Sequence, residues 1–183
     1  GEPLLNYDAT ISAVRGLIDE KRGGISARKI TVSTVGIPEG ICRLAQEDIP
    51  ITLAISLHAP NDALREELIP INQRYPIGEV LEAAEKFFKS RGREITLEYT
   101  LIRGVNDSNL CADTLGKLAK RLRCNVNLIK YNVVPSLDFE APTAEAVETF
   151  AERLRSAGVN INIRESRGLD SEAACGQLRL RTF

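Results

Sequence analysis

A cysteine close to the end of the chain, Cys175, lies in a segment that suits chemistry at sulfur. The run Glu172–Leu178 surrounds it with alanines and a glycine, and these small residues leave room for a bulky reactant. A thiolate is a strong nucleophile, and a methyl group carried by a sulfonium is a natural target for it. The other cysteines, Cys42, Cys111 and Cys124, lie in helical or strand patterns, and we expect them to be inert packed thiols.

The single histidine, His58, directly follows an apolar run and precedes a stiff turn. It stands in Ser56–Asn61, which reads SLHAPN. An imidazole can bind a ligand or move a proton near neutral pH. A lone histidine is also a common surface or core residue, so its role depends on what surrounds it.

Further hydrogen-bonding groups stand at the start of the chain and at other strand ends. The hydroxyl groups of Ser33 and Thr34 could bind a carboxylate or a ribose, or could simply form a turn. The amide of Asn132, after Tyr131, could bind an adenine edge or a ribose, or could stabilise a loop. In the opening Gly1-Glu2-Pro3, the carboxylate could accept hydrogen bonds from an ammonium group.

Two weaker hypotheses concern basic residues, one for Lys130 and one for a group of arginines. Lys130 would be a Schiff-base candidate if it were buried, although the alternation of a strand can equally point it to solvent. Arg164, Arg167, Arg179 and Arg181 flank the Cys175 segment and would suit phosphate contacts. Acidic residues interspersed among them also fit an ordinary solvated surface.

Short β-branched runs alternate with longer stretches of helical period, which predicts an α/β fold with a parallel sheet and outer helices. We expect strands at Lys29–Ser33, Ile51–Ser56, Ile95–Leu101, Asn125–Lys130 and Val159–Ile163. We expect helices at Tyr7–Glu20, Pro38–Gln46, Asn61–Leu68, Ile77–Lys89, from Asp107 onward, and at Thr143–Ser156. Asn61 and Thr143 should cap the helices that they begin. In parallel α/β folds, ligands bind beyond the carboxyl ends of the strands, so the polar strand ends should converge on one rim.

The composition fits one soluble globular domain. The chain has 183 residues, of which 43% are hydrophobic and 27% charged, and its net charge of -1 provides no overall basic field. It has no apolar run of the roughly 18 residues that span a bilayer and no leader pattern. We therefore expect a soluble cytoplasmic protein, and the scattered cysteines favour reduced thiols over disulfides. The absence of methionine, and a first residue that already belongs to a motif, indicate a fragment.

The separate motifs together resemble one family. Gly1-Glu2-Pro3, Ser33-Thr34, the Ser56–Asn61 run, Tyr131-Asn132 and the Ala174–Leu178 run are similar, in order and spacing, to radical S-adenosylmethionine (SAM) enzymes of the RlmN type, which methylate adenine in RNA. The resemblance covers essentially the whole chain. It implies a partial (β/α) barrel of the radical SAM type, with residues 1–183 forming its C-terminal part and the cluster-binding N-terminal half absent.

The resemblance also implies roles for individual residues. A SAM pocket would be formed by Gly1, Glu2, Ser33, Ser56, Leu57, His58 and Asn132, with the first two holding the amino group of SAM. Cys175 would be the catalytic residue that carries the methyl group. In such enzymes one SAM methylates this thiol, and a second SAM, cleaved at a 4Fe-4S cluster, yields a radical that activates the methylthio group. The resulting carbon radical adds to adenine carbon 2, which is not nucleophilic and therefore requires this route.

One departure from the family is large. No Cys-x-x-x-Cys-x-x-Cys motif occurs, so the thiolates that would hold the cluster are absent from this chain. The resolving cysteine and the RNA-binding N-terminal region of the family are missing as well. We therefore expect no metal ligands here, and no methyltransferase activity from the chain alone.

The expected partners are 23S rRNA, tRNA as a further candidate, and an external electron donor, with a monomer and no membrane contact. Three alternative functions stay open. The first is methylation of adenine carbon 8 by the same superfamily, and the second is a β/α-barrel lyase that uses Lys130 as a Schiff base. The third is a non-catalytic binding module.

Overall fold

The computed structural model describes residues 1–134 and 137–164 of the chain. They form a five-stranded sheet with the order β1-β2-β3-β4-β5, in which each neighbouring pair is parallel. The strands are β1 (Thr31–Thr34), β2 (Thr52–Ser56), β3 (Ile95–Leu101), β4 (Asn125–Lys130) and β5 (Ile161–Arg164). Cys175, Arg167, Arg179 and Arg181 lie outside the described residues.

Helices connect the strands. They are α1 (Tyr7–Ile18), α2 (Pro38–Leu44), α3 (Asp62–Leu68), α4 (Ile77–Arg91), α5 (Asn109–Leu122) and α6 (Ala144–Ser156). Three short 3-10 helices, η1 (Pro3–Asn6), η2 (Ala27–Lys29) and η3 (Pro70–Gln73), complete the order. Among the helices of residues 1–134 and 137–164, none has the length and apolar character needed to cross a bilayer.

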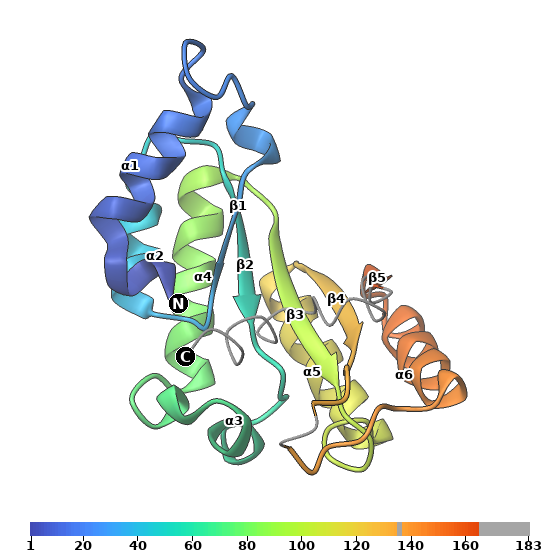
Figure 1. The fold of residues 1–183 in the computed structure, drawn as a ribbon. Coiled ribbons are helices and arrows are strands. Elements are labelled where there is room, and N and C mark those ends of the chain that lie inside the picture. The colour runs from blue at the N-terminus through green and yellow to red at the C-terminus, as the bar shows by residue number, and fades with distance from the viewer. Residues whose placement is uncertain (135–136, 165–183) are drawn as a thin grey trace.

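The strand order confirms a barrel-type sheet. Parallel connections are almost always right-handed, so strands added in chain order keep their helices on the same face, whereas a doubly wound sheet reverses its order. Helices α2, α4, α5 and α6 accordingly contact one another in succession, and Figure 1 shows them ranged around the strands. The described residues form a section of a (β/α) barrel, as the sequence predicts.

The two faces of the sheet differ in chemistry, and β3 shows this most clearly. The residues that face the helices are fully buried: Ile95, Leu97, Tyr99 and Leu101. The alternating residues on the opposite face are polar and only partly buried: Thr96, Glu98 and Thr100. Apolar burial against the helices stabilises the fold, and the polar face is left to bind a ligand or another part of the protein.

Most predicted elements are observed, with differences at their ends. Strands β3 and β4 have the predicted bounds, whereas β1 is shifted toward the C-terminus. The predicted caps of α3 and α6 are confirmed, because the side chains of Asn61 and Thr143 accept hydrogen bonds from backbone N–H groups at 3.0 and 3.1 Å. The prediction that Asp107 opens α5 is wrong. Ser108 caps this helix, and Asp107 accepts a hydrogen bond from the Gly104 N–H instead.

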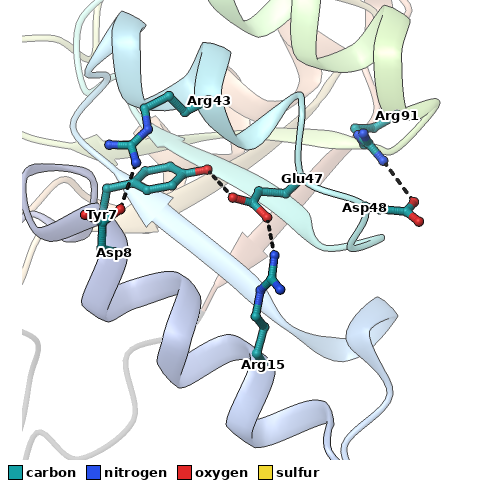
Figure 2. A network of polar contacts seen from close by, with 7 residues as sticks. All are labelled: Tyr7, Asp8, Arg15, Arg43, Glu47, Asp48 and Arg91. Atoms are coloured by element: carbon teal, nitrogen blue, oxygen red, sulfur yellow. Dashed lines mark hydrogen bonds and ion pairs between the residues drawn. The ribbon is translucent and has the colours of Figure 1, made fainter.

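A polar network fastens α1 to the segment after α2 and so holds the start of the chain (Figure 2). The hydroxyl of Tyr7 donates to Glu47 at 3.0 Å, and Arg15 donates to the other oxygen of that carboxylate at 2.9 Å. Arg43 lies over the Tyr7 ring, 3.7 Å from its centroid, and pairs with Asp8. Burial, followed by the hydrogen bond to Glu47, raises the pKa of Tyr7 to about 12. The network therefore fixes where η1 and the N-terminus meet the sheet.

Candidate functional site

The strands are parallel, so their carboxyl ends lie along the same edge of the sheet, and the N-terminus lies near the end of β1 (Figure 1). Glu2 makes the connection to β1. Its Oε1 accepts hydrogen bonds from the hydroxyl of Thr34 at 2.7 Å and the Leu4 N–H at 3.0 Å, and its Oε2 accepts one from the Val35 N–H at 2.8 Å. A carboxylate has about four acceptor positions, so Oε2 retains room for one more donor, such as an ammonium group.

The two hydroxyl residues at the end of β1 have different surroundings. Thr34 is buried, and its Oγ1 accepts a hydrogen bond from the Gly36 N–H at 3.0 Å while it donates to Glu2. Gly36 has φ +96°, and a Cβ there would lie 2.7 Å from Val80, so the strand end requires glycine. Ser33 alternates with Thr34 and is exposed on the opposite face of the sheet. Thr34 is therefore structural, and Ser33 is the hydroxyl accessible to a ligand.

The segment after β2 is held by β3. The backbone N–H groups of Leu57 and His58 both donate to the carbonyl oxygen of Glu98, at 3.0 and 3.2 Å. The side chain of Leu57 is fully buried in the core. Leu57 therefore fixes the position of the backbone between Ser56 and His58, and it has no side-chain group to offer a ligand.

His58 has an unusual and well-fixed conformation. Its φ is +55°, a left-handed value that costs of the order of 1 kcal/mol for a residue other than glycine. Its Nδ1 accepts a hydrogen bond from the Thr100 N–H at 3.0 Å. Burial, and then the charge of Arg65, lower the pKa of His58 to about 4. The imidazole is thus neutral at pH 7, with its proton on Nε2 as a hydrogen-bond donor.

A buried arginine that the sequence reasoning missed, Arg65, joins the ends of β1 and β2. Its side chain is fully buried, and its hydrogen-bond acceptors within the described residues are four backbone carbonyls and one side-chain amide. These acceptors are the carbonyl oxygens of Val35, Ser56, Leu57 and Tyr75, and Oδ1 of Asn72. Burial lowers the pKa of Arg65, while the nearby Asp62 raises it.

A buried amide, Asn106, similarly joins the ends of β2 and β3, and it was also missed. Its Nδ2 donates to the carbonyl oxygens of His58 and Thr100, at 2.8 and 2.7 Å. Its Oδ1 accepts from the Ile102 N–H at 2.7 Å, and its carbonyl oxygen accepts from the hydroxyl of Tyr99 at 2.9 Å. The backbone and the side chain of His58 are therefore both held in place from β3.

The other predicted residues that the structure describes are Asn132, Gly1, Lys130 and Arg164. Asn132 is partly buried two residues beyond the end of β4, and Gly1 is exposed with open space around its Cα. Lys130 is exposed, so the burial that a Schiff-base lysine requires is not observed. Arg164 faces Glu98, with 3.9 Å between Nη1 and Oε2.

The described cysteines do not form a metal site. Cys124 is buried, its thiol donates to the Ala119 carbonyl at 3.7 Å, and burial raises the pKa of this thiol to about 12. Cys42 and Cys111 are partly buried on α2 and α5. Residues 1–134 and 137–164 contain no group of three or more histidine, cysteine or acidic side chains that could hold a metal ion. An iron–sulfur cluster therefore does not fit the described residues.

Comparison with curated proteins confirms the family resemblance. The chain is 46% identical over 180 residues to the probable dual-specificity RNA methyltransferase RlmN of Salinispora tropica, covering 97% of this chain and 48% of that protein. It is 45% identical over 181 residues to the protein of the same description from Thermotoga petrophila, covering 99% of this chain and 52% of that protein. The chain thus spans about half the length of these relatives. No protein-family model matches it.

Solved structures also resemble this chain in fold. A radical SAM methyltransferase from Sphaerobacter thermophilus superposes with a TM-score of 0.93 at 48% identity, covering 97% of this chain and 52% of that one. A domain of pyruvate-formate lyase-activating enzyme from Bacteroides vulgatus superposes with a TM-score of 0.65 at 20% identity, covering 90% of this chain and 95% of that one. The second likeness supports the fold alone.

Replacing Arg65 with methionine should destabilise the fold by about 3 kcal/mol or more, because it leaves several buried carbonyl oxygens without donors. Arg74→Met is the matched control, since Arg74 is exposed and lies over the ring of Tyr75, and it should change the free energy of unfolding by less than about 1 kcal/mol. Urea unfolding followed by circular dichroism measures both. Equal effects of the two substitutions would show that the buried guanidinium is dispensable.

The pKa of His58 predicts how stability depends on pH. The unfolded state, with an ordinary histidine pKa near 6.5, binds a proton more readily than the folded state, with a pKa of about 4. Stability should therefore fall as the pH is lowered from about 6.5 to 4, by a contribution of the order of 2 kcal/mol from this residue. His58→Gln should flatten that part of the profile, measured as urea midpoints from pH 4 to pH 8. A slope that the substitution leaves unchanged would contradict the assignment.

Proposed function

We propose that this chain, which matches RlmN-type radical SAM RNA methyltransferases over about half of their length, is the C-terminal part of the catalytic barrel of such an enzyme. The complete protein would methylate carbon 2 of adenine in 23S rRNA, and also in tRNA. The observation that supports the proposal is the placement of three separate motifs at the carboxyl ends of parallel strands: Glu2 binds the end of β1, Ser56–His58 ends β2, and Asn132 follows β4. The sequence identity to the RlmN relatives, along nearly all of this chain, supports the same reading.

The chemistry of this edge fits SAM. The free acceptor position on Glu2 suits the ammonium group of the cofactor, since Thr34 and Val35 fix the carboxylate without using all of its acceptor capacity. The neutral His58 and the exposed Ser33 can donate to carboxylate or hydroxyl oxygens. When bound, SAM would supply the methyl group and the radical precursor, and Glu2, Ser33 and His58 would hold and orient it.

The cluster and the methyl carrier belong to other parts of the protein. None of the described residues forms a cluster site, so we assign the 4Fe-4S cluster to a part of the complete protein outside them. We assign the role of methyl carrier to Cys175, which lies outside the described residues, because its sequence segment resembles the one that holds the methyl-bearing cysteine of the family. The described cysteines, of which Cys124 is buried with a raised pKa, are unsuited to this role.

We prefer carbon 2 over carbon 8 as the methylated atom because the relatives from Salinispora tropica and Thermotoga petrophila are RlmN proteins. The lyase alternative loses its basis, since Lys130 is exposed on β4. The third alternative, a non-catalytic binding module, is distinguished from the enzyme by the methylation assay of the complete protein.

In the complete protein, purified with its cluster, Cys175→Ala should abolish methylation of adenine while SAM is still bound, because the carrier sulfur is lost and the strand edge is intact. Cys111→Ala is the matched control and should retain activity, since that thiol lies on the outer helix α5. Mass spectrometry of treated RNA measures the product. Normal methylation by the Cys175 variant would overturn the proposal.

The chain alone should produce no methylated adenine, even after treatment with iron and sulfide. Methylation by the isolated chain would contradict the assignment of the cluster to another segment.

A further inference from the structure

The polar face of the sheet contains a carboxylate oxygen that is buried without a hydrogen-bond partner. Among the described residues, the buried polar side-chain atoms without a partner are Nε of Arg93, Oε2 of Glu98 and the hydroxyl of Tyr131. The Glu98 side chain lies in the middle of β3 and exposes only 12% of its surface. An unpaired buried polar atom is unfavourable, and more so when it is charged, so native structures seldom retain one without a role.

The neighbours of Glu98 hold it without satisfying this atom. Nδ2 of Asn127 donates to the other oxygen, Oε1, at 2.9 Å, which fixes the plane of the carboxylate. Nη1 of Arg164 lies 3.9 Å from Oε2, too far for a hydrogen bond, and the Arg164 side chain is 59% exposed. Such an ion pair is weak. Oε2 is therefore an oriented acceptor to which none of residues 1–134 and 137–164 donates a hydrogen bond.

This acceptor lies one strand away from the proposed SAM pocket. Ser56, the last residue of β2, pairs in register with Glu98, and Glu98 pairs with Asn127 on β4. The backbone of Glu98 also accepts the hydrogen bonds from Leu57 and His58. The side chains of Ser56, Glu98 and Asn127 thus form a row across the polar face, in register with the residue that precedes the Leu57-His58 segment.

The charges around Glu98 select the kind of donor. The guanidinium of Arg164, although exposed and 3.9 Å away, already offsets part of the Glu98 charge, so a second cation at Oε2 gains less than it would at an isolated carboxylate. A neutral donor, such as a hydroxyl, does not depend on the remaining charge. Carboxylates accept hydrogen bonds from ribose hydroxyls in other nucleotide-binding sites.

The geometry points to Glu98 as the acceptor for the ribose hydroxyls of SAM, with Asn127 orienting the carboxylate and Ser56 beside it. The inference rests on the proposed function and adds a subsite to it. Glu98 then distinguishes the ribose from a deoxyribose.

The test uses the complete protein with its cluster and measures the Kd of SAM and of its 2′-deoxy and 3′-deoxy analogues by equilibrium dialysis. Glu98→Gln keeps the size of the side chain and the acceptor for Asn127, but it replaces the free oxygen with an NH2 group. We expect this variant to bind SAM about tenfold more weakly or worse, and to lose the preference for SAM over at least one deoxy analogue that the wild type shows.

Glu94→Gln is the matched control. Glu94 is an exposed glutamate just before β3 that accepts a hydrogen bond from Asn125 at 3.5 Å, and its substitution should leave each Kd unchanged. The midpoint of thermal unfolding should be similar for both variants and the wild type.

Failure of SAM binding and failure of ribose recognition by Glu98 give different results in these measurements. A wild type that does not bind SAM overturns the proposed function together with the inference. A wild type that binds SAM but makes no distinction between it and either deoxy analogue overturns the inference alone, whatever the stability of the variant. A Glu98→Gln variant with unchanged affinity for SAM also overturns it, including when the KM for RNA rises.

Discussion

A guanidinium buried among carbonyl oxygens determines the shape of the candidate site. Arg65 binds the backbone where β1 and β2 end and also holds the η3 segment, so three separated stretches of chain meet at one charge. Burying a cation is unfavourable unless its donors are used, and here the donors find fixed acceptors. The same positive charge contributes to the low pKa of His58. Both the backbone geometry at the ends of β1 and β2 and the protonation state of His58 therefore depend on Arg65.

Asn106 complements Arg65 on the other side of His58. The amide holds the carbonyl of His58 against β3, and the backbone N–H of Thr100 holds its imidazole. These contacts stabilise the left-handed backbone of His58, which an isolated chain would rarely adopt. The neutral ring therefore presents its Nε2–H in a fixed direction, which is the preorganisation that ligand binding requires.

The sequence allowed the elements to be predicted, because strands and helices leave local periodic patterns. The alternation in β3 and the caps at Asn61 and Thr143 are examples. The residues that assemble the site were not predicted, because their partners are distant in the chain or are backbone atoms. Arg65 binds Val35, 30 residues away, and Asn106 binds His58, 48 residues away. A basic residue in a short helix reads as surface charge until its burial is known, and an asparagine in a loop reads as a turn.

The central claim is that SAM binds across the carboxyl ends of the strands. Hydrogen–deuterium exchange of the complete protein, with and without SAM, tests it most directly. The account predicts slower exchange on addition of SAM in residues 33–36, 56–61 and 131–134, with α5 and α6 unchanged on the outer layer. Protection confined to the outer helices, with these strand-end segments unaffected, would contradict it.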